Sequence, residues 1–149
     1  MDSKGQIIEI VISELDLYLI DRVRELRALH HPYMSQVKLS QKIELSEGYI
    51  SKVENLKERA KYNIRALNKI AHAFGLHSYS QLFPPTLLPD DMLRIRLQLP
   101  ANEKKGKLKP DMSGNIPKGY RLISKRRLSE EEMALWNNNE MEYLTIIPH

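Results

Sequence analysis

The short connection between two amphipathic segments constrains the fold of this chain more than any other feature. Residues 35–43 and 46–55 each place apolar side chains at helical spacing, and Ser35 and Ser46 supply oxygens that suit an N-cap. Only residues 44–45 separate the two predicted helices, so we expect their axes to cross steeply rather than lie antiparallel. The apolar positions of this stretch are Leu39, Ile43, Leu45, Ile50 and Val53. A small residue is expected at Ser40, because the two helices approach closely there.

Helical spacing also marks the segments on either side of this pair. A helix is predicted from about Ser13, and Pro32 ends it because proline cannot continue the backbone ladder. Asn63 is expected to cap a further helix, and Gly75 to end it in a left-handed conformation. Residues 78–83 predict one more helical turn.

Strand patterns occur at both ends of the chain. The predicted strands are 6–12, 92–99, 120–124 and 143–147, each rich in β-branched or alternating apolar residues. Ser129 and Glu132 form a capping-box pattern that opens a short helix through about Asn137. Pairing of the first strand with the second or the last would tie the two ends of the chain together.

Composition excludes several classes of protein. The 149 residues include no cysteine, which rules out a disulfide framework, a thiolate nucleophile and a cysteine-ligated metal. No apolar run approaches the ~20 residues that a membrane helix needs. The apolar stretch at 7–12 is broken by Glu9 and lacks a cleavage site, so it does not resemble a signal peptide. We therefore expect a cytoplasmic protein that makes no contact with membranes.

The formal charge of +4 is unevenly distributed. Residues 34–65 carry a net +3, and residues 101–127 carry nine basic and two acidic side chains. Residues 128–149 carry five acidic and no basic side chains. The basic stretch contains a predicted loop with Lys104, Lys105, Lys107 and Lys109, which either contacts DNA backbone beside the second helix of the pair or is neutralised by the acidic residues 130–132.

The run MSQVKLSQKIELSEGYISKVEN, residues 34–55, resembles the Cro/repressor-type (XRE-like) helix-turn-helix family. It aligns without a gap to that family's Ser/Thr-Gln start, its Leu-Ala-like helix and its Ser-x-x-Tyr-Ile-Ser-x-Ile/Val-Glu-Asn pattern. The segment KYNIRALNKIAHAFGL resembles the helix that follows, so the resemblance covers about residues 13–83. One departure is Glu44, which occupies the turn position usually held by glycine.

The resemblance implies a fold class and a domain division. We expect a mainly α, lambda-repressor-like helix-turn-helix bundle with a small α+β C-terminal extension. Residues 1–12 are predicted to form an N-terminal strand or arm, and residues 13–83 the DNA-binding domain. Residues 84–149 are predicted to form the α+β unit, a candidate dimerisation module because strand edges pair readily.

The resemblance also implies that the outward face of the second helix, 46–55, enters the major groove of double-stranded DNA. Lys52 is suited to guanine acceptors and Glu47 to a cytosine amino group. Tyr49 either reaches the groove or packs as a core or dimer aromatic. Glu54 is expected to be structural. The candidate DNA-binding residues are Gln36, Gln41, Ser46, Glu47, Gly48, Tyr49, Ser51, Lys52, Asn55, Lys57, Arg59 and Lys61, the last four at the phosphate backbone.

No catalytic pattern accompanies this motif. The sequence has no glycine-rich phosphate loop, no HExxH and no nucleophile–histidine–acid spacing. The adjacent His30 and His31 point in different directions on a helix end and so do not suit one metal ion. We therefore expect no enzyme activity, no cofactor and no metal site.

The leading hypothesis is a sequence-specific transcriptional regulator, most simply a repressor, that binds DNA as a homodimer. A second hypothesis is an antitoxin-type protein, whose C-terminal unit binds a partner protein while the helix-turn-helix regulates its operon. A third is a phage-type or defence-system regulator that senses a small ligand.

Overall fold

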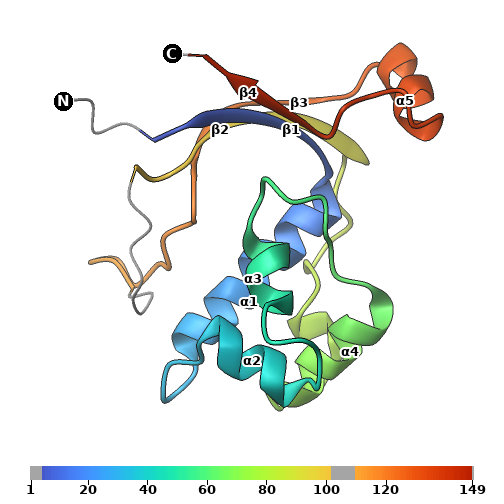
Figure 1. Ribbon diagram of the computed structural model, residues 1–149. Helices are drawn as coiled ribbons and strands as arrows, with labels where there is room; N and C mark the ends of the chain where they lie inside the picture. The colour runs from blue at the N-terminus through green and yellow to red at the C-terminus, as the bar shows by residue number, and fades with distance from the viewer. Residues whose placement is uncertain (1–4, 102–109, 149) are drawn as a thin grey trace. The chain divides into compact units, whose positions relative to one another are not determined.

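The computed structural model describes residues 5–101 and 110–148 and has a mixed α+β fold. Two compact units share the described chain: one includes residues from 1–15, 88–105 and 118–149, and the other residues from 16–87 and 106–117. The elements in chain order are β1 (Ile7–Ser13), α1 (Glu14–Leu29), α2 (Gln36–Lys42), α3 (Tyr49–Glu54), α4 (Ile64–Ala73), the short 3-10 helix η1 (Tyr79–Gln81), β2 (Met92–Gln98), β3 (Arg121–Arg127), α5 (Glu130–Asn137) and β4 (Leu144–Ile147) (Figure 1).

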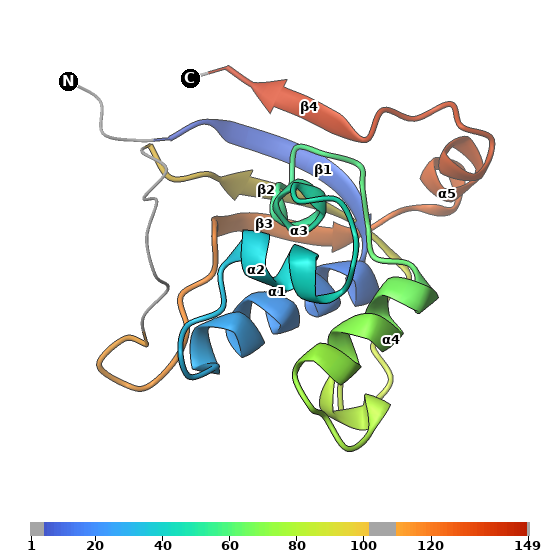
Figure 2. The same ribbon diagram turned by 60° about the horizontal axis from the view of Figure 1, so that its bottom comes forward.

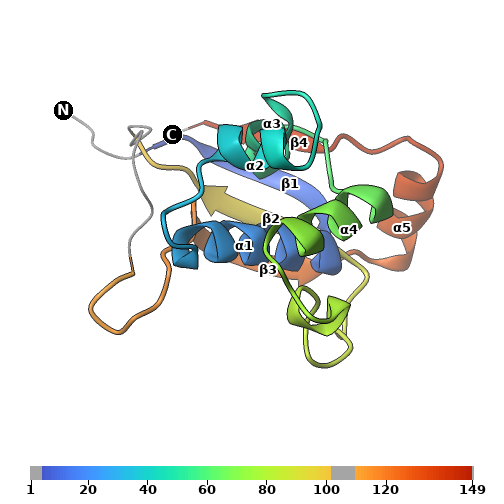
Figure 3. The same cartoon turned by 90° about the horizontal axis from the view of Figure 1, so that it is seen from below.

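The first unit is built on a four-stranded antiparallel sheet in the order β3-β2-β1-β4, which can be followed in Figure 3. β1 pairs with β2 from Ile7 opposite Gln98 to Ser13 opposite Met92. On its other side, β1 pairs with β4 from Ile7 opposite Ile147 to Ile10 opposite Leu144. The N-terminal strand is therefore an inner strand of a sheet whose other members follow much later in the sequence.

This topology corrects the expected fold class. A mainly α bundle with a small α+β C-terminal extension is wrong, because the sheet interleaves strands from both ends of the chain. The reason lies in residues 6–12, which the sequence predicts as a strand but which the expected fold class places outside the helical bundle as an N-terminal strand or arm. Ile8, Ile10, Val11 and Ile12 are each no more than 1 % exposed. Continuous burial of this kind means that both faces of the strand are covered, and the strand also pairs along both of its edges, with β2 and with β4.

The two faces of the sheet differ in chemistry. Ile8, Ile10 and Ile12 lie opposite Leu97, Ile95 and Leu93, and this apolar row is buried. On the other face Glu9 accepts hydrogen bonds from Arg94 and Arg96 across the strands, each at 2.9 Å. These two guanidinium groups hold the pKa of Glu9 below its ordinary value, although burial acts in the opposite direction and is the largest single influence.

Helix α5 begins with the capping box that the sequence predicts, and the glutamate of this box binds the polar face of the sheet. The Ser129 hydroxyl accepts from the Glu132 N–H, and the Glu132 carboxylate accepts from the Ser129 N–H. The same carboxylate binds Arg126 of β3 and Arg94 of β2. Hydrogen bonds from Arg126 and from the Ser129 backbone lower the pKa of Glu132 far below its ordinary value.

The second unit is helical and contains the two short helices that the sequence predicts. α2 and α3 cross steeply: in Figure 2, α3 is seen nearly along its axis while α2 lies across the view. Asn63 caps α4, its side chain accepting from the Ala66 N–H at 2.8 Å, as expected. Within the described residues, no helix is long and apolar enough to cross a membrane.

Three helices end in the same hydrogen-bonded motif, but each uses a different residue at the left-handed position. Glu44 after α2 and Asn139 after α5 both have φ 59°, and Gly75 after α4 has φ 65°. After α2, the Glu44 N–H donates to the Gln41 carbonyl and the Leu45 N–H donates to the Ser40 carbonyl, which is the Schellman pattern. Glu44 therefore holds a conformation that a side chain with a Cβ adopts at a steric cost.

Replacing Glu44 with glycine is expected to relieve this cost. We predict that Glu44→Gly raises the free energy of unfolding by about 0.5–1 kcal/mol, the steric gain exceeding the entropy of glycine in the unfolded chain. Gly75→Ala, which adds a Cβ at the equivalent position of α4, is expected to lower it by about 1 kcal/mol. Urea unfolding measures both, and a Glu44→Gly protein less stable than wild type would contradict the prediction.

Candidate nucleic-acid interface

A single buried hydroxyl joins the two helices of the motif. Ser40 on α2 is fully buried, and its Oγ donates to the Gln36 carbonyl at 2.9 Å. The same oxygen accepts the backbone N–H of Ile50, the second residue of α3, at 3.2 Å. The small side chain at position 40 thus allows the close approach that the sequence predicts. Its hydroxyl has a second role, because it accepts the Ile50 N–H, which an alanine of similar size is unable to do.

This bond takes the place of the N-cap that the sequence predicts at Ser46. The expected helix start at Ser46 is wrong: α3 begins at Tyr49, its N-cap is Gly48, and no side chain on the cap residue accepts a bond. Residues 46–49 form a turn instead, in which the Tyr49 N–H donates to the Ser46 carbonyl at 2.9 Å. One of the unpaired N–H groups at the start of α3 is satisfied by Ser40 from the neighbouring helix.

Removing the Ser40 hydroxyl is expected to cost more stability than removing that of Ser46. Ser40→Ala leaves the buried N–H of Ile50 without its acceptor, which costs about 1–3 kcal/mol. Ser46→Ala, at the position where sequence alone places the cap, is expected to change the free energy of unfolding by less than about 0.5 kcal/mol. Urea unfolding of the two variants tests this order, and equal losses would show that the hydroxyl of Ser40 does not cap α3.

A buried ion pair ties α3 to α1. Arg27 and Glu54 have side chains only 2 % and 3 % exposed, and the guanidinium donates to both carboxylate oxygens. Arg27 also donates to the Tyr33 hydroxyl at 2.7 Å and to the Met34 carbonyl at 3.1 Å. Burial lowers the pKa of Arg27, but Glu54 outweighs it and the net shift is upward. Glu54 is therefore structural, as the resemblance implies.

Breaking this pair is expected to destabilise the protein strongly. Arg27→Met leaves the Glu54 charge buried without its main partner, and we expect a loss of about 3–5 kcal/mol. Arg24→Met is the matched control, because Arg24 lies 3.7 Å from the same carboxylate and is more exposed. We expect it to cost less than about 1 kcal/mol. Chemical unfolding distinguishes the two, and a small effect of Arg27→Met would contradict a stabilising role for the pair.

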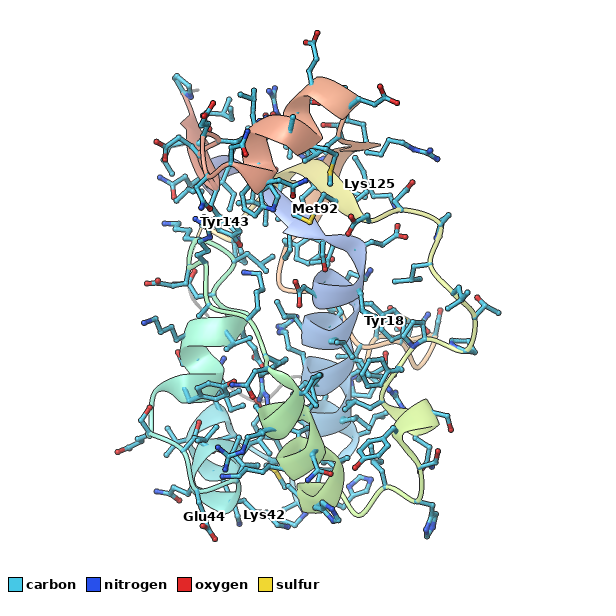
Figure 4. The ribbon with its side chains drawn as sticks, turned by 90° about the vertical axis from the view of Figure 1, so that its right-hand side faces the viewer. Tyr18, Lys42, Glu44, Met92, Lys125 and Tyr143 are labelled. Atoms are coloured by element: carbon cyan, nitrogen blue, oxygen red, sulfur yellow. The ribbon has the colours of Figure 1, made fainter. Side chains whose placement is uncertain are left out.

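Most of the candidate DNA-binding residues lie on the surface of this motif. Ile50 and Val53 of α3 are fully buried, which leaves Ser51 and Lys52 on its exposed side. Figure 4 shows Lys42 and Glu44 projecting at the far end of α2, where the chain turns toward α3. The exposed candidates are Gln41, Ser46, Glu47, Gly48, Ser51, Lys52, Asn55, Lys57 and Arg59.

The remaining three candidates are half-buried and make contacts within the protein. The amide of Gln36 donates to Glu54 at 2.9 Å. The ring of Tyr49 lies 6.2 Å from that of Tyr62, its hydroxyl is buried, and burial raises its pKa. The Lys61 ammonium donates to three backbone carbonyls, those of residues 58, 59 and 60. Burial lowers the pKa of Lys61 to about 8, although Asp16 opposes the shift.

Sequence reasoning missed Arg27 and the role of the Ser40 hydroxyl, on both of which the geometry of the motif depends. Arg27 carried a signal, because it continues the i, i+4 series of Leu19 and Val23 along the buried side of α1. A charged residue in such a series needs a buried partner. The hydroxyl of Ser40 carried no comparable signal, since serine, alanine and glycine satisfy the spacing equally well.

The predicted basic loop with Lys104, Lys105, Lys107 and Lys109 lies outside the described residues. Across the part of the chain that the structure describes, no group of three or more histidine, aspartate or glutamate side chains is arranged to hold a metal ion.

Comparisons of the chain with protein-family models, with curated proteins and with solved structures found no match. What the motif does is therefore inferred from its own residues.

Proposed function

We propose that this protein binds double-stranded DNA in a sequence-specific manner through α3 and thereby regulates transcription, as a repressor in the simplest case. The observation that carries the proposal is the exposed side of α3. Its inward residues are fully buried, whereas Ser51 and Lys52 face outward on a short helix set across α2. A helix presented in this way fits the major groove, where base edges are accessible.

Two exposed lysines on and after α3 support this proposal. Lys52 lies on the exposed side of the helix, and Lys57 is exposed in the loop that follows. The Asn55 side chain accepts the Lys57 N–H at 3.1 Å, which orders the start of that loop. Lys52 is the candidate for reading bases, because it projects from the helix itself. Lys57 is the candidate for a phosphate contact, because it lies beyond the end of α3.

Three half-buried residues act in the proposed DNA binding mainly by positioning α3 and the loop that follows it. Tyr49 and Gln36 set the position of α3 through the protein interior, by packing on Tyr62 and by bonding Glu54. Lys61 holds the loop through three carbonyls, so its contribution to DNA affinity is secondary.

The proposal predicts different binding defects for two lysines. A DNA site selected by the wild-type protein from a random pool supplies the specific ligand. Lys52→Ala is expected to weaken binding to that site by about tenfold and to relax sequence preference, since one good base contact is worth about 1–3 kcal/mol. Lys57→Ala is expected to weaken binding to all sequences about equally and to lower the magnitude of the salt slope by about 1.

Lys69→Ala on α4 is the charge-matched control, and it is expected to change neither affinity nor preference. Affinities are measured by fluorescence anisotropy over a range of salt concentrations. Failure of the random pool to enrich any sequence, or an unaltered preference in Lys52→Ala, would overturn the proposed role of α3.

A further inference from the structure

The sheet has two open edges, and they differ sharply in charge. At one edge β3 is exposed along its whole length and carries Arg121, Lys125, Arg126 and Arg127. At the other edge β4, with the sequence LTII, carries no charged residue, and Ile146 is 47 % exposed. Figure 4 shows Tyr143, next to β4, and Lys125 of β3 at opposite edges of the sheet.

One backbone hydrogen bond fixes which backbone groups of β4 face its open edge. The Val11 N–H donates to the Tyr143 carbonyl at 3.0 Å. Opposed residues in an antiparallel pair alternate between bonded and non-bonded positions. The bonded positions between β1 and β4 are therefore Glu9 with Thr145 and Ile7 with Ile147. It follows that the N–H and C=O groups of Leu144 and Ile146 point away from β1.

We infer that a second copy of this chain pairs with this edge, β4 against β4, in an antiparallel register. With the two-fold axis at Thr145, Leu144 of each copy lies opposite Ile146 of the other. All four outward backbone groups on each strand then find partners. The two Thr145 side chains meet at the axis in a non-bonded position, a cross-strand pair that is favourable in sheets.

Other registers of the β4–β4 pair bring residues outside β4 into the pairing. Moving the axis to Ile146 places Leu144 opposite Pro148, which has no N–H to donate. Moving it to Leu144 places Ile146 opposite Glu142, outside the strand. The register about Thr145 is therefore the one that uses only residues of β4.

The opposite edge disfavours a second copy. The Leu128 N–H donates to the Met92 carbonyl at 3.1 Å, so the groups of Lys125 and Arg127 face outward by the same alternation. Self-pairing about Lys125 brings two lysines directly opposite each other, which is destabilising. A register shift at Ile123 also bends this strand. Basic side chains and bulges are two of the devices by which proteins protect an open edge.

This inference deepens the proposed function by giving the DNA-binding protein a homodimer interface, and it rests on that function only because helix-turn-helix proteins bind paired half-sites as dimers. Its test contains no DNA, so the two proposals fail separately. A dimer without sequence preference would overturn the DNA proposal alone, and a sequence-specific monomer would overturn the interface alone.

The first experiment uses the absence of cysteine from the chain. Thr145→Cys places two thiols at the proposed axis, where opposed Cβ atoms are close enough for a disulfide. We expect this variant to form a disulfide-linked dimer under mild oxidation at least tenfold faster than Ile123→Cys, the control on β3. Equal rates, or faster linkage of Ile123→Cys, would overturn the inference.

The second experiment needs no covalent trap. Sedimentation equilibrium over a range of protein concentrations is expected to show a monomer–dimer equilibrium for the wild type. Ile146→Lys is expected to weaken it at least tenfold, whereas Ile123→Lys, the same change on the other edge, leaves it unaltered. Circular dichroism checks that both variants are folded. A wild type that stays monomeric, or an Ile146→Lys dimer of unchanged affinity, would overturn the inference.

Discussion

The ion pair between Arg27 and Glu54 is the interaction on which the arrangement of the helical unit depends. It connects α1 to the last turn of α3, and Gln36 of α2 donates to the same carboxylate. Two charges buried to this extent gain little net stability over a pair of apolar residues, because each loses its hydration. The pair instead fixes the relative orientation of the two side chains. Both carboxylate oxygens accept from a planar guanidinium, and few orientations allow both bonds. The direction of α3, and with it the exposed side that carries Lys52, follows from that geometry.

The parts of the fold that sequence predicts well are those set by neighbours along the chain. Asn63, Gly75 and Ser129 act as the sequence indicates, because a cap is a contact over three or four residues. The existence of β1, β2 and β4 also follows from local pattern, as does the pair α2 and α3. β3 runs to Arg127 rather than ending near Ser124. Its last residues are charged and show no clear strand pattern, but they pair with β2 as far as Leu93 opposite Arg127.

What sequence does not predict is decided by contacts between distant residues. Pattern alone shows that residues 6–12 form a strand, but not that two later strands take both of its edges. Ser46 satisfies the local rule for an N-cap, yet the hydroxyl that caps α3 comes from Ser40 across the turn. The same limit applies to the candidate site. Exposure of Ser51 and Lys52 follows from helical spacing, whereas the inward direction of Tyr49 depends on Tyr62, thirteen residues later.

The inner position of β1 has a consequence for how this protein is made. The helical unit is nearly continuous in sequence and closes through local contacts, so it is able to fold soon after residue 87 leaves the ribosome. β1 is synthesised first but has no partner until residues 92–98 emerge, and its second edge stays open until residues 144–147 follow. During that interval a segment made mostly of β-branched, apolar residues is exposed on a nascent chain. Such a segment is a hazard for aggregation, and Glu9 is the single charge that interrupts it.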